Sequence, residues 1–124
     1  MVHPMKTVAV LGATPKPGRY AFIAMQRLQE HGFNVVPVNP AFTEVLGMRC
    51  HASIADVPEP IDTVTVYLSP ARSTPLMDEI IRAKPKRIIF NPGAENDRLA
   101  KAAGLAGIQV INDCTLVMLA DGRF

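Results

Sequence analysis

The sequence has little of what several classes of protein require. Its two cysteines, Cys50 and Cys114, lie far apart and match no metal-ligand spacing, and its three histidines form no i, i+4 pair beside an acid. No apolar run approaches the roughly 20 residues of a membrane span, and the first residues lack the apolar stretch of a secretory signal. The net charge of +2 is too small to indicate nucleic acid. We therefore expect a reduced, cytoplasmic protein with no metal site and neither membrane nor nucleic acid as partner.

The chain has the size and composition of one globular domain. Its 124 residues suffice for a single hydrophobic core. A charged fraction of 19% and a hydrophobic fraction of 48% are typical of a soluble globule. We predict a single domain over residues 1–124.

Short apolar runs rich in β-branched residues recur along the chain. They are 8–11, 35–38, 64–68, 88–90 and 108–111. Most do not alternate with polar residues, so they predict strands buried on both faces, as in a parallel sheet. Pro37 argues against a fully hydrogen-bonded central position for the second of them.

Helical patterns separate these runs. One predicted helix buries a face of four residues, listed by position as Ala21, Ala24, Met25 and Leu28. A second is expected to begin with Thr74 as its cap and Pro75 at its first position, and a third near Asn96. Ser53 resembles the start of a capping box and predicts one short helix before the third strand.

The alternation of strands and helices favours parallel pairing, right-handed crossovers and helices on both faces. We predict an α/β fold, a doubly wound Rossmann-like parallel sheet of about five strands in the order 3-2-1-4-5. In such sheets the ligand crevice lies at the carboxyl ends of the strands. The loops that follow the strands are therefore the candidate binding loops.

The loop after the first strand has the chemistry of a phosphate site. Gly12, Ala13 and Thr14 form a turn of small residues, and Pro17 and Arg19 follow before the first helix. Such a turn exposes backbone N–H groups and a helix N-terminus, and an arginine adds a bidentate contact. A tight turn that binds nothing is the alternative.

Three later strands each end in a polar residue followed by proline. The pairs are Asn39 with Pro40, Ser69 with Pro70, and Asn91 with Pro92. Proline fixes φ and ends pairing, so each loop leaves its strand in a defined direction with a polar group beside the crevice. Prolines that simply terminate strands are the alternative.

The same loops depart from a nicotinamide site. An NAD-binding domain normally has Asp or Glu at the end of the second strand, to hold the ribose hydroxyls. Here Asn39 stands at that place, and no carboxylate follows until Glu44. The first loop also departs from G-x-G-x-x-G, because Ala-Thr follows Gly12 and Pro17 precedes the next glycine.

Six stretches in order cover nearly the whole chain and carry a family resemblance. They are VLGATPKP at 10–17, GFNVVPVNP at 32–40, the segment 47–58, IDTV at 61–64, NPGAEN at 91–96 and GIQVINDC at 107–114. In them the chain resembles the small stand-alone CoA-binding proteins related to the N-terminal domain of the succinyl-CoA synthetase α subunit. The resemblance implies a Rossmann-like fold that holds coenzyme A (CoA) or an acyl-CoA across the strand ends.

The resemblance also implies which loops meet the ligand. The first turn and Arg19 would contact phosphates, the loop after the second strand the adenosine, and the loops after the fourth and fifth strands the pantetheine. Lys16 and Arg72 could add charge or face solvent. The implied binding residues are Gly12, Ala13, Thr14, Pro17, Arg19, Asn39, Pro40, Ser69, Pro70, Asn91, Pro92, Gly93, Asn112 and Cys114.

Catalysis has no support in the sequence. The larger ligases that share the resemblance use further domains, one of them with a phosphorylated histidine. No Gly-x-Ser-x-Gly elbow or paired-carboxylate motif is present. Cys114 is the one candidate for reactivity, through a mixed disulfide with CoA, and a buried inert thiol is the alternative.

Three functions remain open. The first is non-catalytic binding of CoA or an acyl-CoA, for sensing it or delivering it to a partner. The second is an NAD(P)-dependent redox enzyme or sensor, and the third is an interaction module with an empty crevice. The apolar run 116–119 could pair two copies into a homodimer or pack on its own domain.

Overall fold

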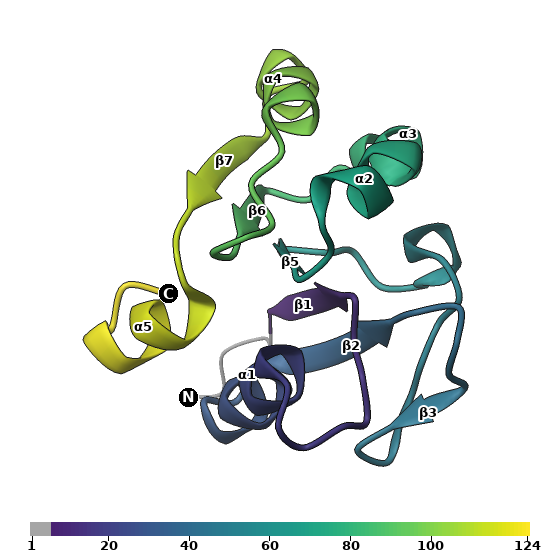
Figure 1. Cartoon of the computed structure of the whole chain (residues 1–124), viewed down its shortest axis with the longest axis vertical. Coiled ribbons are helices and arrows are strands. Elements are labelled where there is room, and N and C mark those ends of the chain that lie inside the picture. The colour runs from purple at the N-terminus through teal and green to yellow at the C-terminus, as the bar shows by residue number, and fades with distance from the viewer. Residues whose placement is uncertain (1–5) are drawn as a thin grey trace.

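A five-stranded parallel sheet forms the centre of the computed structural model, which describes residues 6–124 (Figure 1). Each strand pairs with its neighbours in parallel. The strands are β1 (Thr7–Leu11), β2 (Asn34–Val38), β5 (Thr63–Val66), β6 (Arg87–Phe90) and β7 (Gln109–Asn112). The predicted α/β fold with a parallel, Rossmann-like sheet is confirmed.

The predicted strand order 3-2-1-4-5 is wrong. The sheet runs β2-β1-β5-β6-β7, which is 2-1-3-4-5, because the chain after β2 crosses back over β1 and pairs β5 with β1. This leaves β2 at an edge, where Pro37 fits. The carbonyl oxygen of Pro37 faces outward and accepts a hydrogen bond from the backbone N–H of His51 at 3.0 Å. The missing N–H of Pro37 therefore removes no bond to β1.

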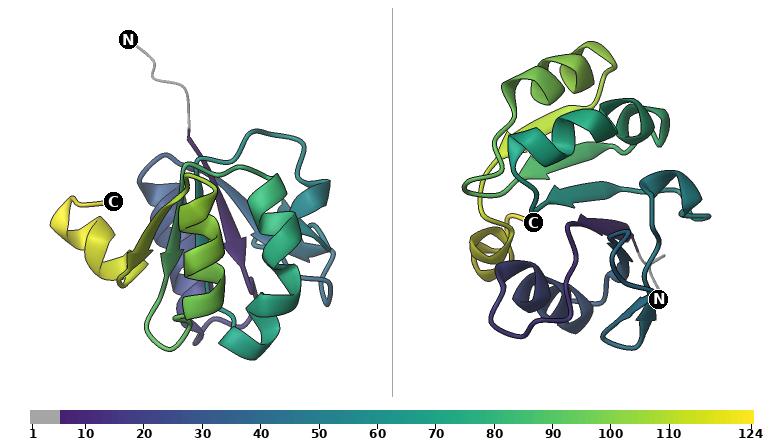
Figure 2. Two further views of the ribbon diagram at one scale, coloured as in Figure 1. Left: turned by 90° about the horizontal axis from the view of Figure 1, so that it is seen from above. Right: turned by 45° about the vertical axis from the view of Figure 1, so that its right-hand side comes forward.

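The helices cover both faces of the sheet (Figure 2). On one face α1 (Tyr20–Glu30) lies beside α5 (Thr115–Asp121). On the other lie α2 (Pro70–Ser73), α3 (Met77–Arg82) and α4 (Asp97–Leu105), with the short 3₁₀ turns η1 (Ile54–Asp56) and η2 (Thr74–Leu76). Within residues 6–124 no helix is both long and apolar enough to cross a membrane.

The core consists of two apolar layers, one on each face of the sheet. Val8 and Val10 of β1 pack towards α1, while Ala9 and Leu11 pack towards α3 and α4. All five residues of β1 are buried, which explains why its sequence is a continuous apolar run. The predicted buried face of α1 is confirmed in full.

The helix predicted from Thr74 begins earlier. Ser69 is the N-cap of α2 and Pro70 takes its first position, since a fixed φ near −65° suits that place. Thr74 and Pro75 lie in η2, between α2 and α3. The sequence predicted the cap at Thr74, before Pro75, whereas the structure has it at Ser69, before Pro70.

A small hairpin follows β2 that the sequence analysis did not predict. It joins β3 (Glu44–Val45) to β4 (Met48–Arg49) through Leu46 and Gly47, whose φ values are 53° and 73°. A two-residue hairpin turn of this kind needs positive φ at both positions, and leucine seldom supplies it. The pair Leu46-Gly47 is therefore an unusual hairpin turn, and the sequence contains little indication of it.

Two predicted helix starts are confirmed. The Oδ1 of Asn96 caps α4 by accepting the Leu99 N–H at 3.0 Å, and Ser53 Oγ accepts the Ala55 N–H at 3.1 Å at the start of η1. Asn96 is also buried, and its Nδ2 donates to Ser73 Oγ at 2.8 Å. One side chain thus joins α4 to the end of α2.

Replacing this cap tests how much the joint stabilises the fold. We expect Asn96→Ala to lower the free energy of unfolding by about 2–3 kcal/mol, because it removes the cap and leaves a buried hydroxyl without its donor. Urea denaturation monitored by circular dichroism measures the change. Asn112→Ala, at an exposed asparagine, is the matched control and should change stability by less than about 0.5 kcal/mol. Equal losses in the two variants would contradict the assignment.

Candidate functional site

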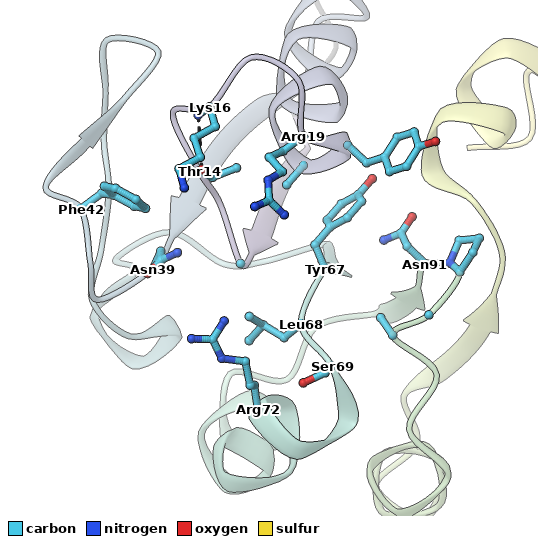
Figure 3. A pocket seen from close by; sticks show the side chains of 16 residues that line it. Thr14, Lys16, Arg19, Asn39, Phe42, Tyr67, Leu68, Ser69, Arg72 and Asn91 are labelled. Carbon is cyan, nitrogen blue, oxygen red and sulfur yellow. Dashed lines mark hydrogen bonds between the residues drawn. The ribbon is translucent and has the colours of Figure 1, made fainter.

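A cleft of about 480 Å³ lies at the carboxyl ends of β1, β2, β5 and β6 (Figure 3). Its walls are the loops that follow these strands, where the fold predicted a ligand crevice. The predicted residues that line it are Gly12, Thr14, Arg19, Asn39, Ser69, Asn91, Pro92 and Gly93, and Lys16 and Arg72 line it too.

The structure places the remaining predicted residues elsewhere. Pro40 lines a neighbouring pocket of about 200 Å³, and Cys114 another of about 240 Å³. Ala13 is fully buried under the first turn. Three residues are exposed and line none of these spaces: Pro17, Pro70 and Asn112.

Gly12 sets the floor of the cleft. Its φ is +93°, and a Cβ there would lie 3.2 Å from the backbone carbonyl carbon of Tyr67 and 3.0 Å from Leu68 Cδ2. Its N–H donates to the Val38 carbonyl at 3.1 Å. The turn after β1 thus contacts both neighbouring strand ends, and only glycine allows both the conformation and the approach.

Asn39 fastens the loop after β2 to the loop after β1. Its Nδ2 donates to the Ala13 carbonyl at 2.8 Å, and its Oδ1 accepts the Ala41 N–H at 2.9 Å. Both ends of the amide are therefore engaged within the protein. Asn39 borders the cleft as predicted, and its first role is to hold the cleft's shape.

Asn91 also holds the shape of the cleft, from the end of β6, and its side chain is buried. Its Nδ2 donates to Thr65 Oγ1 at 2.7 Å and to the Val66 carbonyl at 2.9 Å. Its Oδ1 accepts the Thr115 N–H at 2.9 Å, at the start of α5. The side chain fixes where β6 ends and where α5 begins.

Positive charge is concentrated in the cleft. Arg19 and Arg72 enter from opposite walls, with Lys16 beside the first turn (Figure 3). None of the ion pairs within residues 6–124 involves these three cations, and no acidic side chain lines the cleft. Arg19 is the N-cap of α1, which has no side-chain cap and no acid in its first turn. The dipole and the cations together favour an anionic ligand.

Six lining residues were not predicted: Tyr20, Ala21, Phe42, Tyr67, Leu68 and Ala94. The sequence signal for two of them was present but misread. The predicted strand 64–68 ends at Val66, so Tyr67 and Leu68 leave the sheet and face the cleft. Their apolar surface adds a second kind of wall beside the cations.

The Tyr67 hydroxyl is buried at the back of the cleft. Burial raises the pKa of Tyr67 to about 12, and the nearby hydroxyls of Thr115 and Thr65 oppose part of the rise. The hydroxyl oxygen is inaccessible and makes no direct hydrogen bond within the described chain. Tyr67 is therefore neutral at ordinary pH.

Residues 6–120 match the family model described as a CoA binding domain. The chain belongs to this family. The YneT protein of Bacillus subtilis (strain 168) is 26% identical over 108 residues, which are 87% of this chain and 80% of YneT. A structure described as a hypothetical protein from Pyrococcus horikoshii OT3 is 35% identical with a TM-score of 0.90, covering 94% of this chain and 83% of that one.

Part of the chain is also similar to much longer enzymes. Acetate–CoA ligase [ADP-forming] I of Archaeoglobus fulgidus is 36% identical over 70 residues, which are 56% of this chain and 10% of the ligase. The chain thus spans about one tenth of that relative. The chain is thus similar both to a protein near its own length and to a segment of a large ligase.

Replacing Gly12 tests whether its close approach shapes the CoA binding domain. We expect Gly12→Ala to lower the free energy of unfolding by about 1–3 kcal/mol, since alanine disfavours this φ and its Cβ would crowd the Tyr67 backbone. Gly18→Ala is the control in the same loop, because nothing lies within 4 Å of its Cβ. Urea unfolding of both variants measures the difference in their stability. Equal midpoints would show that the close approach of Gly12 to Tyr67 does not require glycine.

The two tyrosines of a chain without tryptophan allow a direct titration. In a Tyr20→Phe variant, absorbance at 295 nm should report a Tyr67 midpoint near 12 instead of about 10. The unfolded chain then loses this proton first, so stability falls as pH rises from about 10 to about 12. Tyr67→Phe should lack that part of the fall. A midpoint near 10 would mean that the hydroxyl is not buried.

Proposed function

We propose that the protein binds CoA or an acyl-CoA in the cleft and performs no chemistry on it. One observation carries the proposal: three cations that form no ion pair within residues 6–124 line a cleft that adjoins two smaller pockets. A ligand with phosphates in its middle, a flat base at one end and an apolar arm at the other matches this distribution. Membership of the CoA binding domain family supports the same ligand.

The pocket at the β2 side suits the adenine. It is lined by Pro40, Leu68 and Leu76 as well as Arg72 and Glu79, so it offers apolar contact beside a guanidinium and a carboxylate. The phosphates would lie between Lys16, Arg19 and Arg72. The pantetheine would then run past Tyr67 and Asn91 towards the β6 side of the cleft.

The walls disfavour a nicotinamide dinucleotide. Its adenosine ribose is normally held by a carboxylate at the end of the second strand. Asn39 takes that place, and its amide is already bonded to Ala13 and Ala41. Among residues 6–124 the main cleft has no acid in its lining, and the carboxylate of the β2-side pocket, Glu79, already accepts a hydrogen bond from Ser53 Oγ.

The non-catalytic part of the proposal rests on the chemistry in the cleft. Among residues 6–124 its lining contains no histidine, carboxylate or cysteine, so the hydroxyls of Thr14 and Ser69 have no such base beside them in the lining to activate them. Cys114 lies outside the cleft, in the adjoining pocket. A protein of this kind would present bound CoA to a partner or respond to its concentration.

Thermal unfolding with separate ligands tests the proposal. We expect millimolar CoA or acetyl-CoA to raise the midpoint by roughly 5 °C or more, because a ligand at 100 times its Kd adds about 2.7 kcal/mol to a small domain. NAD, NADP and ADP complete the panel. A shift with NAD or NADP but not with CoA would replace the proposal with a redox role. No shift with any ligand would favour an interaction module.

Charge removal tests the placement of the phosphates. Arg19→Ala and Arg72→Ala should each weaken CoA binding about tenfold, as expected for loss of one charge-assisted contact, and should flatten its salt dependence. Arg98→Ala is the control, because Arg98 is an exposed cation on α4 away from the cleft lining. Isothermal titration at two salt concentrations gives the Kd values. Unchanged affinity in both cleft variants would move the phosphates elsewhere.

A further inference from the structure

A second pocket adjoins the cleft on its β6 side. It measures about 240 Å³ and is lined by Tyr20, Tyr67, Asn91, Pro92, Cys114 and Leu116. The first four of these also line the main cleft, so the two spaces lie side by side with these residues between them. Tyr20 and Pro92 are exposed, so a ligand in the cleft would reach this pocket along the exposed edge that they form.

The chemistry of this pocket differs from that of the cleft. No charged side chain lines it, and rings, a leucine and a thiol form most of its surface. Phosphate has no counter-charge here, whereas hydrocarbon gains by leaving water. A dry apolar cavity of about 150 Å³ holds a benzene molecule, so this volume is ample for a short acyl chain.

Tyr67 contributes to both spaces through its ring. Its hydroxyl is inaccessible and lies beside the hydroxyls of Thr65 and Thr115, so it is turned into the protein and not towards a ligand. The surface that Tyr67 offers to a ligand is therefore the apolar part of its ring.

We infer that this pocket, here named the acyl pocket, takes the acyl group of an acyl-CoA. The inference rests on the proposed function, because it requires the phosphates of the same ligand to lie in the cleft. It makes an acyl-CoA with a short aliphatic chain, and not free CoA, the preferred ligand. The acyl chain lies against Leu116 and the Tyr67 ring, and no bond forms or breaks.

Isothermal titration with CoA, acetyl-CoA, butyryl-CoA and hexanoyl-CoA tests the inference on the intact chain. Affinity should rise with chain length by up to roughly fourfold for each methylene group buried, until the pocket is full. Equal Kd values for all four ligands would overturn the acyl pocket and leave the proposed function standing. Binding of none of them would overturn the proposed function itself.

Two matched tryptophan variants on α5 test whether the dependence of affinity on acyl chain length arises in the acyl pocket. Leu116→Trp fills the acyl pocket, and Val117→Trp adds the same ring at a neighbouring position that is 47% exposed and lines no pocket described here. We expect Leu116→Trp to abolish the chain-length preference while its Kd for free CoA changes less than threefold. Val117→Trp should keep the preference. A preference that survives in a folded Leu116→Trp variant would overturn the inference.

If Leu116→Trp does not fold, Leu116→Phe gives a smaller obstruction at the same place. It should shorten the longest acyl chain that still gains affinity, so hexanoyl-CoA should lose more than acetyl-CoA. Circular dichroism and the unfolding midpoint check that each variant keeps the fold. The same loss for every chain length would count against the acyl pocket.

Discussion

The close approach of Gly12 to the backbone of Tyr67 is the constraint on which the site depends. It lets the turn after β1 lie directly against the end of β5, while the Gly12 N–H bonds to the end of β2. Three strand ends therefore meet at one point, and the loops after them form the walls of one cleft. A side chain at this position would be strained at a φ of +93° and would press on the Leu68 side chain and the Tyr67 backbone.

Polar groups of two kinds line the cleft and have different roles. The amides of Asn39 and Asn91 form hydrogen bonds within the protein. Asn39 joins the loops after β1 and β2, and Asn91 joins the end of β6 to β5 and to the start of α5. The cations make no such bonds to acids within residues 6–124 and remain available. Neutral amides thus hold the shape, and unpaired charge supplies attraction, an arrangement that preorganises the site for an anion.

Much of this could be predicted from the sequence, and the failures have physical causes. The strands were recognised because burial on both faces demands continuous apolar runs, as in β1. Strand order depends on which way a crossover turns, which apolar content does not encode, although Pro37 had indicated an edge. Tyr67 was missed because a strand's last residues look the same in sequence whether they pair or turn into a cleft. Asn39 and Asn91 were placed at the cleft, but the bonds from Asn39 to Ala13 and from Asn91 to Thr115 reach residues 24 or more positions away.

The bond from Asn39 to the Ala13 carbonyl has a consequence for how this fold can diverge. A carboxylate at this position, the usual group for grasping a ribose, has no hydrogen to donate at neutral pH and would face a carbonyl oxygen 2.8 Å from the present nitrogen. The exchange would place a negative charge against this carbonyl oxygen, in the loop that leads to Arg19. A lineage that acquired a carboxylate at position 39 would therefore have to rebuild the turn after β1 as well.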